Sequence, residues 1–469
     1  MTITDVTLQE RHLAELRQLV LPTGGAEGAA YVLFGRSRIE EDPWERRARQ
    51  RFLSYDVVSI PPNEIISAGH DHITWSTASF VRLLKQAKDD GLVAGIVHSH
   101  PQGPPAFSEQ DHRNEAQLAQ LARNRNGVGT PLLSVLLTGS GAIRAQAWLG
   151  GKHPEPANVV SVIGRHLALH AATTFGQSVE AFARQALAFG ETTNAQLRKL
   201  RVGVVGCGGT GSATALLLAR LGVGQIVLFD DDIVESTNLN RLHGARQSDA
   251  DAMRAKVDVL AREISGMALG CRAIPIKKWI GDPQCRDALK SCDVIFGCTD
   301  DNDGRLLLNR LAYFYLIPVI DMGLAIEPEP NGGGVRELSG RSTVLAPGGS
   351  CLLCRQIVDP VMARDEDLKR RNPTEYERRK REAYVRGGDN PAPAVVTFTT
   401  ATACMAVDEL LQGLTNFRGG DGWAWQRVRR FDLMRDRLPG AIVNEDCPIC
   451  VDQAYWGLGD VDPFLDRIG

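Results

Sequence analysis

The sequence has no run of about 18 consecutive apolar residues, the shortest stretch that normally crosses a bilayer as a helix. Residues 1–19 carry charges and lack the apolar core of a secretory signal. Neither sign of charge dominates, because 53 Lys and Arg residues oppose 56 Asp and Glu residues and leave a formal net charge of −3. A protein that coats nucleic acid would carry a positive excess. We therefore expect a cytoplasmic protein without a nucleic-acid or membrane partner.

Internal repeats and low-complexity segments are also missing, so the 469 residues must build ordinary globular cores. That length predicts about three structural units of roughly 150 residues, with at least two cores. Helical and strand patterns are mixed at first, whereas from about residue 201 strands and helices alternate, which is typical of a doubly wound parallel sheet. Gly and Pro gather at 150–159. The expected parts are a mixed α/β domain over 1–155, a linker over 156–175 and a Rossmann-like α/β domain over 176–469.

Two CxxC pairs account for four of the ten cysteines: Cys351 with Cys354, and Cys447 with Cys450. In a reducing compartment such pairs bind metal or do redox work more often than they form structural disulfides. Neither pair follows a strand and opens a helix, as a thioredoxin-like redox motif does. Four thiolates suit a tetrahedral structural zinc that joins two distant segments, with two unrelated thiol pairs as the alternative.

His98 and His100 alternate along the apolar stretch 91–100, so both side chains point to one face of the predicted strand. Asp111 falls on the first turn of a helix that Ser108 is expected to cap. Two imidazoles and one carboxylate leave a fourth position open for water, which is typical of catalytic zinc. For the two histidines alone, packing at the end of a strand is the alternative.

The complete string H-S-H-P-x6-S-x2-D at 98–111 resembles the JAMM (JAB) family of zinc isopeptidases, over about residues 5–150. Members have a cytidine-deaminase-like fold and hydrolyse bonds after the C-terminal glycine of ubiquitin-like proteins. The resemblance implies three zinc ligands, His98, His100 and Asp111. It also implies Glu27, in GAEGAAYVLFG, as the general base and Ser108 as the hydrogen-bond donor to the oxyanion. The rival glutamates are Glu40, Glu41 and Glu64.

GCGGTG at 206–211 follows a predicted strand and opens a helix, so its glycines let the backbone approach phosphate groups. Asp230 ends the next strand, where a carboxylate suits ribose hydroxyls. This pattern alone also fits a nicotinamide cofactor. The polar residues that follow, in FDDDIVESTNLNR at 229–241, at Lys256 and in CTDDN at 298–302, suit a triphosphate and magnesium rather than hydride transfer.

These motifs resemble the ThiF-like superfamily of ubiquitin-activating enzymes, which adenylate the C-terminal glycine of ubiquitin-fold proteins with ATP and Mg²⁺. The resemblance implies that Arg241 and Lys256 neutralise charge on the phosphates and that Asp300 holds magnesium, with Asp301 as a rival. It also implies that Arg184, in FARQALAFG, reaches the ATP site of a partner subunit in a homodimer. In this superfamily two CxxC pairs bind structural zinc. The implied nucleotide-binding residues are Gly206, Gly208, Gly209, Gly211, Asp230, Asp232, Asn238, Arg241, Lys256 and Asp300.

Many members of this superfamily carry a nucleophilic cysteine in a loop between the CxxC pairs, but 384–398 contains none. Cys404 lies in the amphipathic stretch TTATACMAVDELL and is expected to be buried as a small apolar residue. We therefore expect the reaction to stop at the acyl-adenylate, or to pass the acyl group to an external thiol.

Together the motifs predict a fusion of a peptidase with an adenylating enzyme, both acting on the C-terminal tail of one ubiquitin-like partner, with a conjugating enzyme as a further candidate partner. Placing both sites on one chain raises the effective concentration of the shared substrate. The fusion resembles parts of bacterial ubiquitin-like conjugation systems, some linked to antiphage defence. Two alternatives remain open: a sulfur-carrier activating enzyme of cofactor or cysteine biosynthesis, and a scaffold that binds such partners without catalysis.

Overall fold

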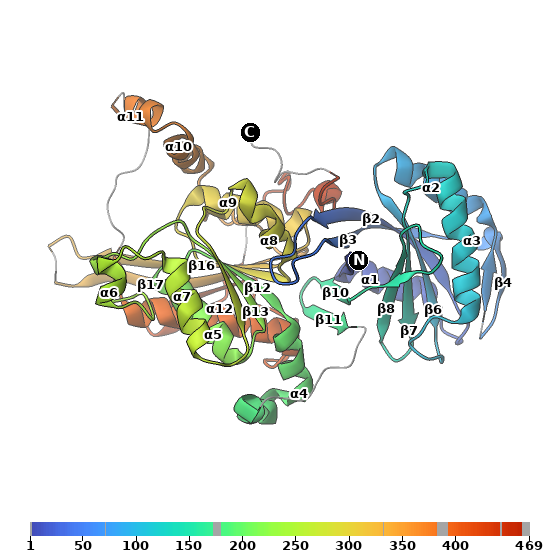
Figure 1. The fold of residues 1–469 in the computed structure, drawn as a ribbon, viewed down its shortest axis with the longest axis horizontal. Coiled ribbons are helices and arrows are strands. Elements are labelled where there is room, and N and C mark those ends of the chain that lie inside the picture. Colours follow the sequence, from blue (N-terminus) through green and yellow to red (C-terminus); the bar gives the residue numbers. More distant parts are fainter. Residues whose placement is uncertain are drawn as a thin grey trace. The chain divides into compact units, whose positions relative to one another are not determined.

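The computed structural model describes residues 2–70, 72–171, 180–331, 333–381, 393–440 and 443–461. The chain divides into two compact units (Figure 1). Unit 1 contains Met1–Thr174, Phe314–Leu316 and Tyr455–Gly469, and unit 2 contains Phe175–Tyr313 and Ile317–Ala454. Within the described ranges, no helix combines the length and the apolar character that a membrane span requires.

Unit 1 is built on a mixed nine-stranded sheet of order β11-β10-β1-β3-β2-β6-β7-β8-β9, with a separate β4-β5 hairpin. Its strands are β1 (Ile3–Gln9), β2 (Ala29–Ile39), β3 (Arg49–Ser59), β4 (Ile65–Ala68), β5 (Ile73–Trp75), β6 (Val93–His100), β7 (Leu132–Thr138), β8 (Ile143–Trp148), β9 (Glu155–Pro156), β10 (Val159–Ile163) and β11 (Leu167–Ala171). Its helices are α1 (Glu10–Val20), α2 (Thr77–Asp89) and α3 (Glu109–Asn126), with the 3₁₀ turn η1 (Pro62–Glu64).

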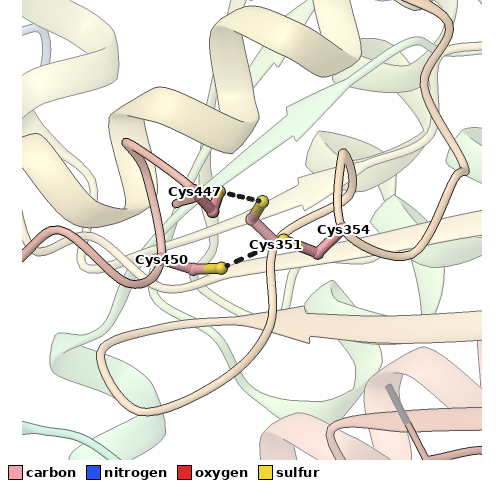
Figure 2. Close-up of side chains that lie close together, drawn as sticks. All are labelled: Cys351, Cys354, Cys447 and Cys450. Atoms are coloured by element: carbon pink, nitrogen blue, oxygen red, sulfur yellow. Dashed lines mark hydrogen bonds between the residues drawn. The ribbon is translucent and has the colours of Figure 1, made fainter. Parts of the chain in front are cut away.

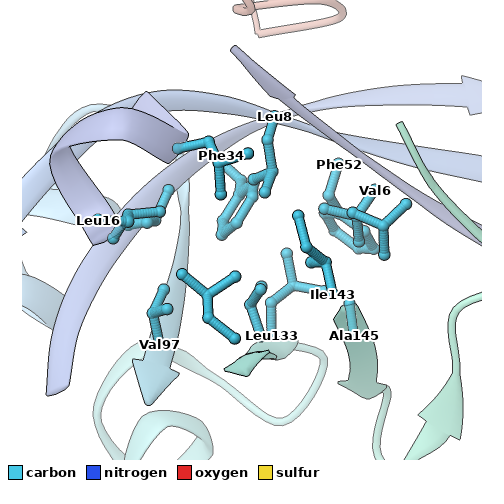
Figure 3. Close-up of a cluster of buried hydrophobic side chains, with 14 of the residues drawn as sticks. Val6, Leu8, Leu16, Phe34, Phe52, Val97, Leu133, Ile143 and Ala145 are labelled. Carbon is cyan, nitrogen blue, oxygen red and sulfur yellow. The ribbon is translucent and has the colours of Figure 1, made fainter. Parts of the chain in front are cut away.

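Both faces of this sheet are buried, which explains why β2 reads as a continuous apolar run. On one face Phe34 packs with residues of α1, among them Leu16 (Figure 3). On the other face Tyr31 and Leu33 pack with residues of α2 and α3, among them Phe80. Successive β2 side chains therefore serve two cores, as the two-residue period of a strand requires. This packing fixes β2 and β6 side by side, and β6 carries the histidines.

Residues 159–171 do not form the expected linker. β10 pairs in parallel with β1, and β11 pairs antiparallel with β10, so both strands extend the sheet of unit 1. The linker prediction over 156–175 is wrong for this part because Val160 and Val162 are buried in the unit 1 core, a non-local pairing that leaves no local signal. Residues 172–175 lie outside the described residues.

The C-terminal segment 455–461 also belongs to unit 1, which differs from the predicted division at residue 176. Gly459 forms a parallel bridge with Arg36 of β2. Asp460 accepts hydrogen bonds from the Arg38 amide (2.5 Å) and from the Tyr315 hydroxyl (2.9 Å). Unit 1 is therefore completed by residues from the far end of the chain.

Unit 2 confirms the predicted doubly wound fold, with helices on both faces of an eight-stranded sheet of order β14-β13-β12-β15-β16-β17-β18-β19 (Figure 1). The first five of these strands are parallel, and β17 to β19 form an antiparallel extension. The strands are β12 (Arg201–Val205), β13 (Gln225–Phe229), β14 (Arg272–Ile276), β15 (Val294–Gly297), β16 (Val319–Pro328), β17 (Val335–Leu345), β18 (Gln426–Arg430) and β19 (Arg435–Arg437).

The helices that follow β11 in the chain are α4 (Ala183–Lys199), α5 (Gly209–Leu221), α6 (Gln247–Asp251), α7 (Lys256–Gly266), α8 (Arg286–Ser291), α9 (Asn302–Phe314), α10 (Pro360–Arg371), α11 (Pro373–Arg381) and α12 (Val396–Thr415). The 3₁₀ turns there are η2 (Glu180–Phe182), η3 (Ser236–Asn238), η4 (Pro283–Cys285) and η5 (Gln453–Tyr455). Helix α12 lies against α5, β16 and β17 and so covers one face of the sheet.

Candidate active sites

Strand β6 presents the two predicted histidine ligands on one face at its carboxyl end. The rings of His98 and His100 have centroids 5.2 Å apart, and both side chains are buried. Asp111, on the first turn of α3, faces them: its Oδ1 lies 3.5 Å from His98 Nε2 and its Oδ2 lies 3.4 Å from His100 Nε2. One ligand atom from each of the three lies within 4.8 Å of the others. The structure thus brings this predicted set together.

The donor set fits a divalent metal. His98 Nε2 is buried and has no hydrogen-bond partner among the described residues, which is costly unless a ligand completes its environment. Two donors about 2.1 Å from one zinc ion lie at most about 4.2 Å apart, and both carboxylate–imidazole distances meet that limit. Burial raises the pKa of Asp111, but the two imidazoles outweigh it and leave the pKa below its ordinary value.

Ser108 sets the position of Asp111 through a capping box at the start of α3. The Asp111 amide donates to Ser108 Oγ (3.1 Å), and the Ser108 amide donates to Asp111 Oδ2 (2.7 Å). Because Ser108 Oγ accepts in this bond, its own proton remains available to a substrate oxygen. The S-x2-D spacing is therefore a helix cap that also holds a metal ligand.

Ser99, between the two histidines, joins β6 to the segment that carries the predicted base. Ser99 Oγ accepts from the Gly28 amide (3.1 Å) and donates to the Val20 carbonyl. A Cβ on Gly28 would lie 2.6 Å from Val20 Cα, so only glycine fits there. Sequence reasoning missed this role of Ser99, although its place inside the H-S-H string was a signal.

Among the candidate bases, Glu27 lies beside the histidine pair. Its Oε1 lies 3.9 Å from His100 Nε2, and the side chain is largely buried. Glu64 instead accepts from the Ser79 amide (2.8 Å) and pairs with Arg82. The other rivals, Glu40 and Glu41, follow the opposite end of β2. The geometry therefore favours Glu27 as the base.

Glu115 is a buried carboxylate that the sequence reasoning did not single out. It lies one turn after Asp111 and accepts from Ser134 Oγ (2.5 Å), Gln146 Nε2 (2.7 Å) and Trp148 Nε1 (2.8 Å). Burial raises the pKa of Glu115. The network fixes the inner face of α3 against β7 and β8, and so holds Asp111 in place. The i, i+4 spacing of the two acids was the available signal.

Unit 2 contains a cavity of about 580 Å³ at the carboxyl ends of β12, β13 and β15. In open parallel sheets this edge is where nucleotides bind. Of the predicted nucleotide-binding residues, the cavity is lined by Gly206, Gly208, Gly209, Asp230, Asp232, Arg241, Lys256 and Asp300. Gly211 lies under the turn, where a Cβ would be 1.8 Å from the Gly206 carbonyl oxygen. Asn238 does not line the cavity, because its Oδ1 accepts from the Glu235 amide (3.1 Å).

Hydrogen bonds and an ion pair hold several charged residues of this cavity in place. Asp230 accepts from the Cys207 amide (2.6 Å) and from the Asp232 amide (2.8 Å), and burial raises its pKa. Lys256 Nζ lies 2.6 Å from Asp232 Oδ2. Burial lowers the pKa of Lys256, but Asp230 and Asp232 outweigh it and leave the pKa above its ordinary value. Lys256 is therefore a fixed cation beside the glycine-rich turn.

Asp300 and Asp301 have different surroundings. Asp301 accepts from the Gly304 amide (2.8 Å) and from Trp279 Nε1 (3.3 Å), so it caps α9. The Asp300 side chain is exposed, lines the cavity and makes no hydrogen bond or ion pair with the described residues. Its carboxylate oxygens are the kind of ligand that Mg²⁺ prefers. The available carboxylate at this point is thus Asp300.

Arg184 lies on the first turn of α4, is exposed, and is not among the residues that line the cavity. Its role in a partner subunit stays a prediction. Among the lining residues that sequence reasoning missed are Trp279, Arg305 and Arg370. They come from the segment after β14, from α9 and from α10, so no single motif contains them.

The four predicted zinc cysteines converge in unit 2 (Figure 2). Cys351 Sγ lies 3.6 Å from Cys447 Sγ, and Cys354 Sγ lies 3.5 Å from Cys450 Sγ. These distances exceed a disulfide bond of about 2.05 Å. Four sulfurs about 2.3 Å from one zinc ion would lie about 3.8 Å apart, so the cluster fits tetrahedral zinc. The neighbouring thiols, Cys450 above all, lower the pKa of Cys351, which favours a thiolate.

The expectation that Cys404 is buried is wrong. Its side chain is exposed on α12, whereas its neighbours Ala403 and Met405 are buried. The inward face of α12 is set by α5 and the sheet, which the local pattern did not reveal. Desolvation raises the pKa of Cys404, and so does Asp408, so the thiol is a weak nucleophile at neutral pH.

The fold and the two sites define the class of protein: a doubly wound α/β unit with a glycine-rich turn is joined to a mixed α/β unit that holds a His-x-His and Asp cluster. A model of the ThiF family matches residues 182–449, more than half of the chain, and the chain belongs to this family. A model of prokaryotic homologs of the JAB domain matches residues 9–150 and accounts for the N-terminal domain. Both predicted family resemblances are confirmed.

Three curated relatives show how far the likeness extends. The chain is 30% identical over 159 residues to the SAMP-activating enzyme E1 of Haloferax volcanii, covering 34% of this chain and 54% of that protein. It is 31% identical over 213 residues to the adenylyltransferase and sulfurtransferase MOCS3 of Mus musculus, covering 45% and 41%. It is 31% identical over 160 residues to the tRNA threonylcarbamoyladenosine dehydratase of Bacillus subtilis, covering 34% and 62%. The chain thus spans only part of each relative's length.

Proposed function

We propose that unit 2 uses ATP and Mg²⁺ to adenylate the C-terminal glycine of a ubiquitin-like protein, and that unit 1 is a zinc-dependent peptidase or isopeptidase for the same tail. The observation that carries the proposal is the cavity that joins the glycine-rich turn to Arg241, Lys256 and Asp300. The names of two relatives, an activating enzyme and an adenylyltransferase, support it.

In the adenylation step a carboxylate oxygen of the terminal glycine forms a bond to the α-phosphorus of ATP. The bond from that phosphorus to the bridging oxygen breaks, and pyrophosphate leaves with the electron pair. Arg241 and Lys256 offset the negative charge on the phosphates, and Asp300 would hold Mg²⁺. No cysteine is available in 384–398, so the product is the acyl-adenylate or a thioester on another protein.

In the hydrolytic step Glu27 takes a proton from water and Ser108 donates a hydrogen bond to the oxyanion. His98, His100 and Asp111 would hold zinc, which when bound polarises the scissile carbonyl and makes water more acidic. Glu27 Oε1 lies 3.9 Å from His100 Nε2, close enough to accept a proton from a water molecule in this pocket.

A second candidate is the activation of a sulfur carrier, because one relative is named as both an adenylyltransferase and a sulfurtransferase. The two functions share adenylation and differ in the product: an amide or ester conjugate in one case, a C-terminal thiocarboxylate in the other. Mass spectrometry of the partner after reaction separates them.

The test is pyrophosphate exchange into ATP, measured with the full chain and candidate ubiquitin-fold proteins that end in glycine. Exchange with one of them, lost in Lys256→Ala, supports adenylation. A chain that binds such a partner but exchanges no pyrophosphate is a scaffold. Arg184→Ala should lower exchange if the homodimer shares its sites, and mixing it with Lys256→Ala should restore part of the activity.

A further inference from the structure

Arg305 lines the nucleotide cavity from α9, and its guanidinium has unused hydrogen-bonding capacity. Its Nη2 donates to the Met322 carbonyl (3.3 Å), and its Nε lies 3.3 Å from Asp321 Oδ1. The Nε is buried yet makes no hydrogen bond within the described part of the chain. The side chain is only 14% exposed, so water satisfies little of this deficit.

Asp321 cannot neutralise Arg305 fully because Arg341 already holds it. Arg341 Nη2 donates to Asp321 Oδ2 (2.6 Å), and Arg341 Nη1 donates to Thr343 Oγ1 (2.6 Å). Asp321 is 1% exposed, and its Oδ1 has no hydrogen-bond partner within the described ranges. Two guanidinium groups therefore share one buried carboxylate. This leaves an excess positive charge, which is costly unless an anion completes the cluster.

Gly323 keeps the cavity open beside these arginines. It lies opposite Arg341 across the β16–β17 pair and lines the cavity. A Cβ at this position would lie 3.0 Å from Arg341 Nη2 and 3.6 Å from Arg305 Nη2. A side chain here would crowd both guanidinium groups, whereas glycine leaves them room for a ligand oxygen.

We propose that Arg305 binds an oxyanion in this cavity, and that this oxyanion is the carboxylate of the C-terminal glycine that is to be adenylated. The inference rests on the proposed adenylation and adds the group that recognises its second substrate. The triphosphate already has the glycine-rich turn, Arg241 and Lys256. The incoming carboxylate must approach a negatively charged α-phosphate, and a buried arginine reduces that repulsion. An arginine fork also matches a carboxylate geometrically.

Binding of two peptides to the full chain tests the assignment: one ends in Gly-Gly with a free carboxylate, and the other is its C-terminal amide. Calorimetry with an α,β-methylene analogue of ATP present avoids turnover. Wild type should prefer the acid about tenfold or more, as charge-assisted hydrogen bonds require. Arg305→Ala should reduce that ratio to about two or less, and Arg305→Lys to an intermediate value. Arg310→Ala, on the same helix but outside the cavity lining, should keep the wild-type ratio.

Two results would overturn the assignment. An unchanged acid-to-amide ratio with weaker binding of the ATP analogue would mean that Arg305 holds the α-phosphate. An unchanged ratio and unchanged analogue binding would mean that Arg305 serves the fold alone. If Arg305→Ala does not fold, the intermediate ratio expected for Arg305→Lys becomes the test, and a wild-type ratio in that variant would overturn the assignment. Pyrophosphate exchange is scored separately, so an acid preference without exchange would refute adenylation and keep the carboxylate site.

Discussion

Gly35 on β2 and Gly457 near the C-terminus touch so closely that a Cβ on Gly35 would lie 1.9 Å from the Gly457 carbonyl oxygen. Nothing larger than glycine fits at position 35 while the C-terminal segment stays in place. The contact joins residues that are more than 400 positions apart, so unit 1 cannot be cut out as an N-terminal fragment without losing part of its packing.

Gly35→Ala should therefore destabilise unit 1 by about 1–3 kcal/mol, the usual cost of overpacking. Hydrogen exchange of β2 and β3 in the full chain reports on this unit alone and should accelerate. Gly129→Ala is the matched control, because a Cβ there meets nothing within 4 Å and should leave exchange unchanged. Equal protection in the two variants would show that the C-terminal segment does not hold β2.

Glu27→Gln should lower peptide cleavage by about 10²–10⁴-fold, because the amide cannot accept a proton from water. Zinc content should stay near that of wild type, since Glu27 is not in the donor set of His98, His100 and Asp111. Cleavage of a substrate with a bond after a C-terminal Gly-Gly sequence and elemental analysis of zinc are the two measurements. Glu64→Gln, which changes a glutamate that pairs with Arg82, should cleave normally. Normal cleavage by Glu27→Gln would remove it from the mechanism.

Asp300→Ala should lower the rate of pyrophosphate exchange by about a hundredfold or more. The free energy of unfolding should stay unchanged. The Asp300 side chain makes no hydrogen bond or ion pair with the described residues, whereas Asp301 caps α9. Asp301→Ala should accordingly cost about 1 kcal/mol of stability and lower exchange less. Exchange assays and chemical unfolding of both variants decide between them. The reverse ranking would move the magnesium role to Asp301.

Most of each site was predictable because its spacing is local. The H-S-H-P-x6-S-x2-D string combines a strand alternation with a helix cap, and both depend on neighbouring residues alone. The turn at Gly206–Gly211 is local in the same sense. What the sequence did not reveal depends on distant partners: the pairing of β10 with β1, the docking of Gly459 on β2, and Arg305, which reaches the cavity from α9. Asn238 is a polar residue of the kind that can contact a nucleotide, but its side-chain amide caps a turn instead.

Unit 1 should lose stability as the pH falls, because His12 is buried and its pKa is lowered to about 3 by burial and by the nearby charge of Arg11. In the unfolded chain its pKa is about 6.5, so the unfolded state takes up a proton first. The stabilisation is complete above pH 6.5 and falls by about 1.4 kcal/mol per pH unit between pH 6.5 and 3.

Between pH 7 and 5 the wild type should therefore lose about 2 kcal/mol more than His12→Gln, which cannot be protonated. Glutamine can still bond to Ser54 Oγ, which lies 3.0 Å from His12 Nδ1. Unfolding followed by hydrogen exchange of α1 measures the difference, and both proteins keep the same metal ligands. Parallel pH curves would show that His12 is not the titrating group.

Cys450→Ser should remove one zinc ion per chain and destabilise unit 2, while unit 1 keeps its metal and its cleavage activity. Cys351 and Cys354 follow β17, whereas Cys447 and Cys450 lie beyond β19, so the bound ion would tie two segments together. His98→Ala is the complementary variant and should lose the other zinc ion without lowering the stability of unit 2. Elemental analysis should give two zinc ions in wild type and one in each variant. Two ions in Cys450→Ser, or none in His98→Ala, would contradict independent sites.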